Sequence, residues 1–236
     1  MGNTSERRAW LGQEYAPWPR RTLSDHFSQL ALQFGEHPLL ITPERTVTYA
    51  ELIEEARSIA RSMLGMGVRR RDHIALLLGN EPEFLFLTVA ASMIGAVAVP
   101  LNTMLREDEL DYLLAQSDAK WVFVHQSIAG VDHEKAIAAI LRAHDGVGDP
   151  LAIEQVVVLA TTDSPVQEEF QDWEYFRAQG KTIPEAALGA RHAISRYPDE
   201  VINIIYTSGT TGQPKGVMLT SDMLLRCGYS SALSCV

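Results

Sequence analysis

The feature that most limits the fold is a repeated alternation, from residue 73 onward, between short apolar runs and segments with helical spacing. Runs rich in Val, Leu, Ile and Ala predict strands over 73–78, 96–100, 120–125 and 155–160. Helical patterns fill the intervals over 82–94, 106–115 and 128–143. Strands that are apolar throughout are typical of parallel sheets, whose crossovers are right-handed. The sequence therefore predicts an α/β fold with a parallel sheet covered by helices on both faces.

Before this alternation, the chain contains two helical patterns and two short strands. Helices are predicted over 23–34 and 49–66, and strands lie on the two sides of a turn at Pro43 and Glu44. Thr48 followed by Glu51 is the capping-box arrangement at the start of the second helix, and the glycines at 65 and 67 end it. We interpret the three arginines at 69–71 as a solvated turn rather than an anion site.

Two segments lack the alternation. Residues 1–22 hold Trp10, Tyr15 and Trp18 in a polar context, which predicts an irregular arm that docks its aromatic rings on a larger body, with a disordered tail as the alternative. Residues 161–198 are rich in Asp, Glu, Gln and Pro and predict a surface excursion with one helix over 173–179. A strand over 201–206 then returns the chain to the core. With 236 residues, the chain could form one large domain or two small ones.

Residues 84–101 carry no charge over eighteen positions, which is the lower limit for a transmembrane helix. Gly95 and Pro100 lie where a buried helix would end and a short strand would run. Because buried α/β elements are apolar on all sides, we interpret this segment as a core helix followed by a strand, with no membrane span.

Charge and cysteine content exclude several kinds of partner. A net charge of −10 and a pI near 5.1 would repel nucleic acid and anionic membranes at long range. Cys227 and Cys235 lack the spacing of a zinc site or a disulfide framework. The first thirty residues have no apolar signal-peptide core. We expect a cytoplasmic protein, and a homo-oligomer remains open.

The stretch from Tyr206 to Gly216 carries the strongest chemical signal. Its glycines can bring backbone N–H groups close to an anion, its hydroxyls can donate to phosphate oxygens, and Lys215 adds a compact positive charge. It is not a Walker loop, because Pro214 precedes the lysine and a glycine follows it. A flexible linker is the alternative interpretation. The candidate ATP-binding residues are Thr207, Ser208, Gly209, Thr210, Thr211, Gly212, Gln213, Pro214, Lys215 and Gly216.

This stretch closely resembles the signature loop of the adenylate-forming superfamily, which includes acyl-CoA synthetases, coumarate-CoA ligases, firefly luciferase and peptide-synthetase adenylation domains. Further blocks resemble the family in the same order. They are Thr48-Tyr-Ala-Glu-Leu52, Asp72-His-Ile-Ala-Leu-Leu-Leu-Gly-Asn80, Gly95-Ala-Val-Ala-Val-Pro-Leu-Asn102, Glu109-Leu-Asp-Tyr-Leu-Leu114, Ser117-Asp-Ala-Lys120 and Pro198-Asp-Glu200. The resemblance covers most of the chain and implies the N-terminal part of the large, AMP-binding domain of such an enzyme.

The resemblance implies a two-step ligase that uses ATP, Mg²⁺ and coenzyme A. A carboxylate attacks the α-phosphorus of ATP to give an acyl-adenylate and pyrophosphate, and the thiol of coenzyme A then takes the acyl group. By position, residues 208–212 would wrap the β- and γ-phosphates, Lys215 would add charge, and Thr207 would be the metal-side hydroxyl. The aromatic arm and the ligase-like middle favour fatty or other hydrophobic acids.

Two alternatives remain beside the acyl-CoA synthetase, namely a peptide-synthetase adenylation domain and a non-catalytic nucleotide-binding fragment. Family enzymes are much longer, and their acyl pocket, adenine and ribose contacts, main magnesium ligand and adenylation lysine lie downstream of this loop. We therefore expect the 236 residues to be inactive alone. Ser221 is a small departure, because relatives often carry His after the preceding Thr.

Other titratable residues predict no catalytic site. His125, His133 and His144 have no nucleophilic Ser or Cys at an elbow nearby, so we interpret them as core or surface histidines. The adjacent acids at 54–55, 107–109 and 168–169 fit helix starts and solvated faces better than an acid/base pair.

Overall fold

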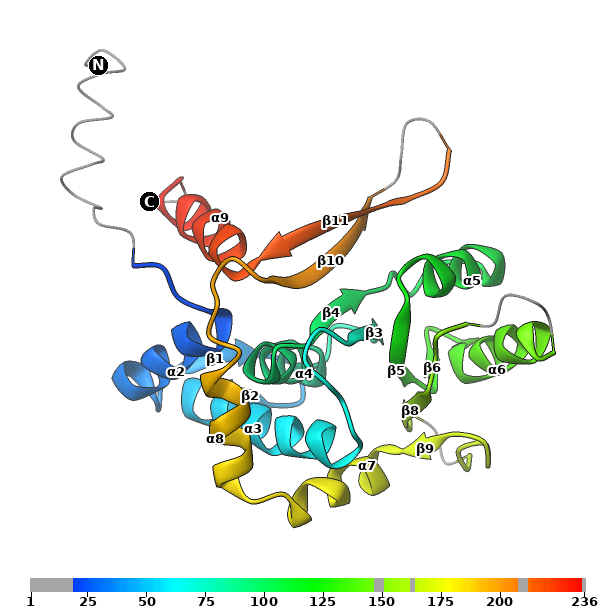
Figure 1. The fold of residues 1–236 in the computed structure, drawn as a ribbon, viewed down its shortest axis with the longest axis horizontal. Helices are drawn as coiled ribbons and strands as arrows, with labels where there is room; N and C mark the ends of the chain where they lie inside the picture. The colour runs from blue at the N-terminus through cyan, green and yellow to red at the C-terminus, as the bar shows by residue number, and fades with distance from the viewer. Residues whose placement is uncertain (1–18, 147–150, 162–163, 208–211, 235–236) are drawn as a thin grey trace.

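The computed structural model describes residues 19–146, 151–161, 164–207 and 212–234. Its centre is a seven-stranded sheet in the order β11-β10-β4-β3-β5-β8-β9 (Figure 1). The parallel strands are β3 (His73–Leu77), β4 (Val97–Pro100), β5 (Ala119–His125), β8 (Gln155–Leu159), β9 (Gln171–Asp172) and β10 (Val201–Thr207). The predicted α/β class and buried parallel strands are confirmed.

The last strand departs from the prediction of a wholly parallel sheet. β11 (Lys215–Thr220) pairs with β10 in antiparallel fashion, because the chain turns straight back after the loop without a crossover helix. Its burial is weak, and Val217 and Met218 are exposed. A half-exposed edge strand lacks the continuous apolar run of a central strand, and this explains why the sequence did not indicate it.

Helices cover both faces of the sheet, and the side chains of each central strand alternate between two cores. On β5, Trp121 and Phe123 enter one core, whereas Val122 and Val124 enter the other. The first core packs under α2 (Leu23–Phe34), α3 (Tyr49–Gly65), α4 (Pro82–Ile94), α7 (Trp173–Gln179) and α8 (Glu185–Ala193). The second packs under α5 (Glu107–Gln116) and α6 (His133–His144).

The local signals near the N-terminus are confirmed. β1 (Pro38–Ile41) and β2 (Thr46–Thr48) form a two-stranded antiparallel sheet. The hydroxyl of Thr48 accepts a hydrogen bond from the Glu51 backbone N–H at 3.2 Å and so caps α3. Residues 1–18, which include the three predicted anchoring aromatics, lie outside the described part of the chain.

The uncharged stretch 84–101 forms a buried helix and strand, as predicted. α4 is buried on nearly every side between the sheet and α3, and β4 follows it after Gly95. In the ranges that the structure describes, no helix combines the length and hydropathy needed to cross a bilayer.

Two other predictions are corrected. The helix expected from 128 begins only at His133, because β6 (Ser127–Ile128) and β7 (Val131–Asp132) form a hairpin whose turn holds Ala129 and Gly130 at positive φ. The excursion over 161–198 is not confined to the surface. It contributes β9, α7, the 3₁₀ turn η1 (Gly180–Thr182) and α8, and it buries Phe176 and Leu188.

Candidate functional site: the phosphate loop

The candidate loop lies at the far end of a two-stranded ribbon formed by β10 and β11 (Figure 1). The cross-strand register places Thr207 opposite Lys215 and Tyr206 opposite Gly216. The described ends of the predicted loop, 207 and 212–216, are therefore brought together. Residues 208–211, with their predicted phosphate-wrapping hydroxyls and glycine, lie outside the described part of the chain.

The loop leaves the sheet at the edge where ligands bind in α/β proteins. β10 runs parallel to β4, with Asn203 paired to Ala98, so Thr207 lies at the carboxyl ends of the strands. In open parallel sheets, crevices beyond these carboxyl ends are the usual ligand sites. A cavity of about 510 Å³ on another side, between α6 and β8, is separate from this edge.

Lys215 begins a strand and not a helix, as expected for a loop that differs from the Walker type. Its side chain is exposed, and so is that of Thr207 across the ribbon. Gly212 has a φ of 125°, a left-handed conformation that a residue with a Cβ rarely adopts. The ribbon thus presents a hydroxyl and an ammonium side by side at the mouth of a glycine-containing turn, an arrangement suited to an anionic ligand.

Gly216 is required by close packing across the ribbon. A Cβ at this position would lie 2.9 Å from Cγ2 of Ile204 and 3.4 Å from the ring of Tyr206. The Tyr206 hydroxyl donates a hydrogen bond to Oε1 of Gln116 at the end of α5, so the ring ties the ribbon to the body of the protein. Burial and the neighbouring Tyr112 and Asp118 raise the pKa of Tyr206, which keeps this phenol protonated as a donor.

The described end of the loop offers Mg²⁺ one candidate ligand that the sequence predicts, the Thr207 hydroxyl. Across 19–146, 151–161, 164–207 and 212–234, no three His, Cys, Asp or Glu side chains converge as metal ligands. The hydroxyl oxygen of Thr207 is a hard donor of the type that Mg²⁺ accepts, and Mg²⁺ usually keeps waters and phosphate oxygens as its other ligands. Thr207 therefore fits a metal that arrives with the triphosphate.

The histidines and paired acids make structural contacts, and Glu55 departs from the predicted solvated face because its carboxylate pairs with Arg177 on α7 at 2.7 Å. His125 is buried, and its Nδ1 accepts a hydrogen bond from the Gly79 backbone N–H at 3.2 Å. Burial lowers the pKa of both His125 and His133, so both side chains favour the neutral form. Among the acids, the Glu109 carboxylate accepts from the Arg106 N–H at 2.9 Å at the start of α5.

The interpretation of residues 69–71 as a solvated turn is only partly right. Arg70 and Arg71 both form ion pairs with Glu200, which directly precedes β10. The Arg70 guanidinium also lies over the Tyr197 ring, 5.7 Å from its centroid. A partner 130 positions away in the chain leaves no local sequence signal, and only the spatial closeness of β10 and β4 brings these charges together.

The sheet order, the two helical layers and the ribbon define an α/β protein with a mostly parallel sheet that ends in an antiparallel edge strand. A sequence model of the family described as AMP-binding enzyme matches residues 27–235, and the chain belongs to that family. The acyl-CoA ligase sidI of Aspergillus fumigatus is 31% identical over 206 residues, covering 86% of this chain and 34% of that protein. The 4-coumarate–CoA ligase 2 of Solanum tuberosum is 30% identical over 195 residues, which cover 82% of this chain and 31% of that protein.

Solved structures agree on the fold. The anthranilate CoA ligase AuaEII, crystallised with anthranoyl-AMP, superposes with a TM-score of 0.67 at 24% identity and covers 86% of this chain and 35% of its own. The inhibitor-bound N-terminal domain of FACL13 from Mycobacterium tuberculosis gives a TM-score of 0.63 at 25% identity. The match covers 85% of this chain and 44% of the FACL13 chain. The chain thus spans about a third of the length of the curated relatives it matches.

Proposed function

We propose that this chain is the N-terminal portion of an ATP-dependent acyl-CoA synthetase, with residues 23–236 forming the first part of its AMP-binding domain and residues 1–22 an arm. The observation that carries the proposal is the ribbon itself. In a member of this family, it holds Thr207 opposite Lys215 at the carboxyl edge of the sheet. We further propose a cytoplasmic location, in keeping with two cysteines that lack the spacing of a disulfide framework.

The loop serves the first half-reaction, in which a carboxylate oxygen bonds to the α-phosphorus of ATP and the bond from that phosphorus to the α,β-bridging oxygen breaks, so that pyrophosphate leaves. Lys215 and the hydroxyls and N–H groups of residues 207–216 bind the β- and γ-phosphates, where negative charge increases as pyrophosphate leaves. Preorganised donors at this position lower the barrier because they need not reorient as charge develops. Bound Mg²⁺, held on the protein side by Thr207, supplies further neutralisation of that charge.

In the second half-reaction, the sulfur of coenzyme A displaces AMP from the acyl-adenylate. The acid is fatty or otherwise hydrophobic, a class supported by the acyl-CoA ligases among the relatives. The 236 residues alone do not complete the site, because the chain covers only a third of those relatives. The exposed apolar side chains of Ile205 and Val217, which pair across the ribbon and so share one face, support this, since a complete domain would cover such a face.

The proposal is tested with a chimera that joins residues 1–236 to the downstream part of the acyl-CoA ligase sidI at the aligned position. With ATP, Mg²⁺, coenzyme A and a panel of fatty and aromatic acids, mass spectrometry should detect acyl-CoA and AMP in equal amounts. Residues 1–236 alone should give neither product. A folded chimera that forms no acyl-CoA with any acid, or acyl-CoA formation by residues 1–236 alone, would contradict the proposal.

A further inference from the structure

The ribbon that carries the loop is attached to the rest of the protein at its base and, close to the loop, through the hydrogen bond from the Tyr206 hydroxyl to Gln116. Val201, the first residue of β10, pairs with Thr220, the last residue of β11, so the two strands enter and leave at the same place. β10 pairs with β4 at Asn203, near this base, and the loop lies at the opposite end. The contacts at the base, together with the Tyr206–Gln116 hydrogen bond, therefore set the direction in which the ribbon points.

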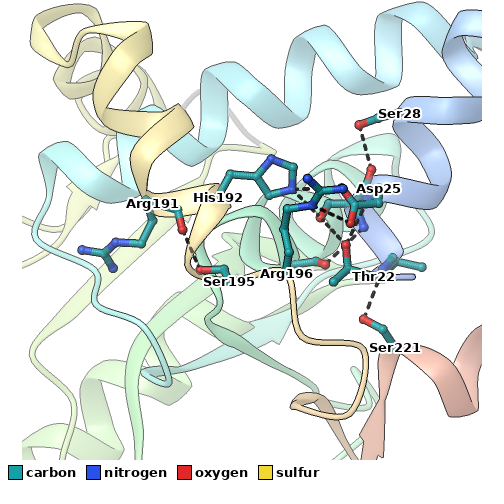
Figure 2. Close-up of polar contacts among 11 residues, drawn as sticks. Thr22, Asp25, Ser28, Arg191, His192, Ser195, Arg196 and Ser221 are labelled. Atoms are coloured by element: carbon teal, nitrogen blue, oxygen red, sulfur yellow. Dashed lines mark hydrogen bonds and ion pairs between the residues drawn. The ribbon is translucent and has the colours of Figure 1, made fainter. Parts of the chain in front are cut away.

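Ser221 makes the first attachment. It opens α9 (Ser221–Ser234) directly after β11 and is fully buried. Its Oγ accepts a hydrogen bond from the backbone N–H of Leu23 at 3.1 Å, which joins the end of the ribbon to the start of α2 (Figure 2). The next residue, Asp222, donates its N–H to the Pro198 carbonyl at 3.1 Å and so links the two sides of the base.

The start of α2 is itself a fixed point. Thr22 caps the helix by accepting the Asp25 N–H at 3.1 Å, and the Asp25 carboxylate pairs with Nε of Arg196 at 3.0 Å (Figure 2). Nε2 of His192 on α8 lies 3.2 Å from Oγ of Ser24. These contacts hold the start of α2 in place. The hydrogen bond from Leu23 to Ser221 therefore also holds the end of the ribbon in place.

Glu200 makes the second attachment, on the other strand. Its carboxylate forms ion pairs with the guanidinium groups of Arg70 and Arg71, the second at 3.0 Å. The Arg70 and Glu200 side chains are 27% and 24% exposed, so this pair is screened less than a fully solvated one. The turn that carries both arginines is tied to the end of α4, since the Arg71 N–H donates to the Gly95 carbonyl at 2.7 Å.

We propose that Ser221 and Glu200 are positioning residues, which fix the base of the ribbon from its two strands and thereby set where Thr207 and Lys215 meet the phosphates of the substrate. This inference rests on the function proposed above. From Val201 to Thr207 the ribbon is roughly 20 Å long at about 3.3 Å per residue. A rotation of about 10° at its base would move the loop end by roughly 3 to 4 Å, enough to break any phosphate hydrogen bond.

The first test is amide hydrogen exchange on the 236-residue chain. Ser221→Ala and Glu200→Gln should speed exchange in peptides covering 201–207 and 215–220 at least tenfold, while peptides covering β3, β5 and β8 keep their rates. Glu168→Gln is the matched control, because Glu168 is an exposed acid away from the ribbon, and it should change neither set. Unchanged ribbon exchange, or equal acceleration in β3 and β5, would overturn the inference.

The second test measures adenylation in the sidI chimera. Both variants should raise the KM for ATP about tenfold, and Glu200→Asp, which keeps a carboxylate, should recover part of that loss. An unchanged KM for ATP in both variants would overturn the inference. If the unsubstituted chimera forms no acyl-adenylate, the proposed function fails, whereas the hydrogen-exchange result still decides whether Ser221 and Glu200 hold the ribbon.

Discussion

Gly95 provides a quantitative test of the packing beside the ribbon base. It ends α4 in a left-handed conformation with φ of 73°, and its N–H donates to the Ala91 carbonyl. A Cβ added here would lie 2.7 Å from Oγ of Ser195 and 3.0 Å from Cγ of Arg70. Gly95→Ala therefore combines backbone strain with a steric clash, and the displaced Arg70 is the partner of Glu200.

The two costs can be separated. A left-handed conformation costs a residue with a Cβ about 1–2 kcal/mol, and overpacking a filled site typically costs about 1–3 kcal/mol. Gly95→Ala should thus lower the free energy of unfolding by about 2–5 kcal/mol, measured by urea denaturation with circular dichroism. Gly67→Ala is the control, because its φ is 93° and no atom lies within 4 Å of the added Cβ. It should lose only the backbone part, about 1–2 kcal/mol. Equal losses in the two variants would refute the packing described at Gly95.

Two further predictions concern the core. Phe176 is fully buried and makes an edge contact with Phe123, with ring centroids 5.1 Å apart. Phe176→Ala should therefore lower the free energy of unfolding by about 3–5 kcal/mol. Tyr175→Ala, at an exposed neighbouring position, is the control and should change the free energy of unfolding by no more than about 0.5 kcal/mol. Burial lowers the pKa of His125. The unfolded chain then binds more protons, so urea denaturation should show stability falling as the pH drops below about 6.5 and levelling off below the folded-state pKa. His125→Gln should weaken that dependence, and an unchanged pH profile would contradict the role given to burial.

Much of the fold follows from local patterns in the sequence. The Val-rich run of β8 and the uncharged stretch of α4 predict their elements because both are buried on nearly every side. Thr48 and Glu51 mark the start of α3, because the Thr48 hydroxyl accepts a hydrogen bond from the backbone N–H three residues further on. These signals are confined to a few neighbouring positions, where spacing and side-chain chemistry determine the structure directly.

The elements that the sequence did not indicate depend on distant contacts. α8 buries Leu188 alone among its own residues, and β11 is a strand because β10 offers it an edge. Gly180 fits against Ser62 on α3, where a Cβ would lie 2.6 Å from the Ser62 hydroxyl. These partners lie far apart along the sequence. Periodicity and propensity, which depend on neighbouring residues, therefore do not predict these contacts.

The candidate site also has one part that local sequence predicts and another that depends on distant contacts. The composition of residues 207–216 predicts a phosphate loop, since glycines, hydroxyls and one lysine are placed there by sequence alone. The pairing of Thr207 with Lys215 and the need for Gly216 against Ile204 appear only in the ribbon. The attachment of that ribbon by Ser221 and Glu200 joins positions 198 and 130 residues apart. Such long-range joints determine where the loop points, and they require the folded structure to be recognised.

The most direct test of the central claim is acid-dependent exchange of labelled pyrophosphate into ATP by the sidI chimera, with and without Lys215. The chimera should exchange pyrophosphate only when a carboxylic acid is present. Lys215→Ala should lower this exchange about tenfold or more, as expected when a preorganised charge at the leaving group is lost. Lys181→Ala, which removes an exposed lysine from η1, is the control and should leave exchange unchanged. Equal exchange rates in the Lys215→Ala and Lys181→Ala chimeras would contradict the assignment of this loop to the phosphates of ATP.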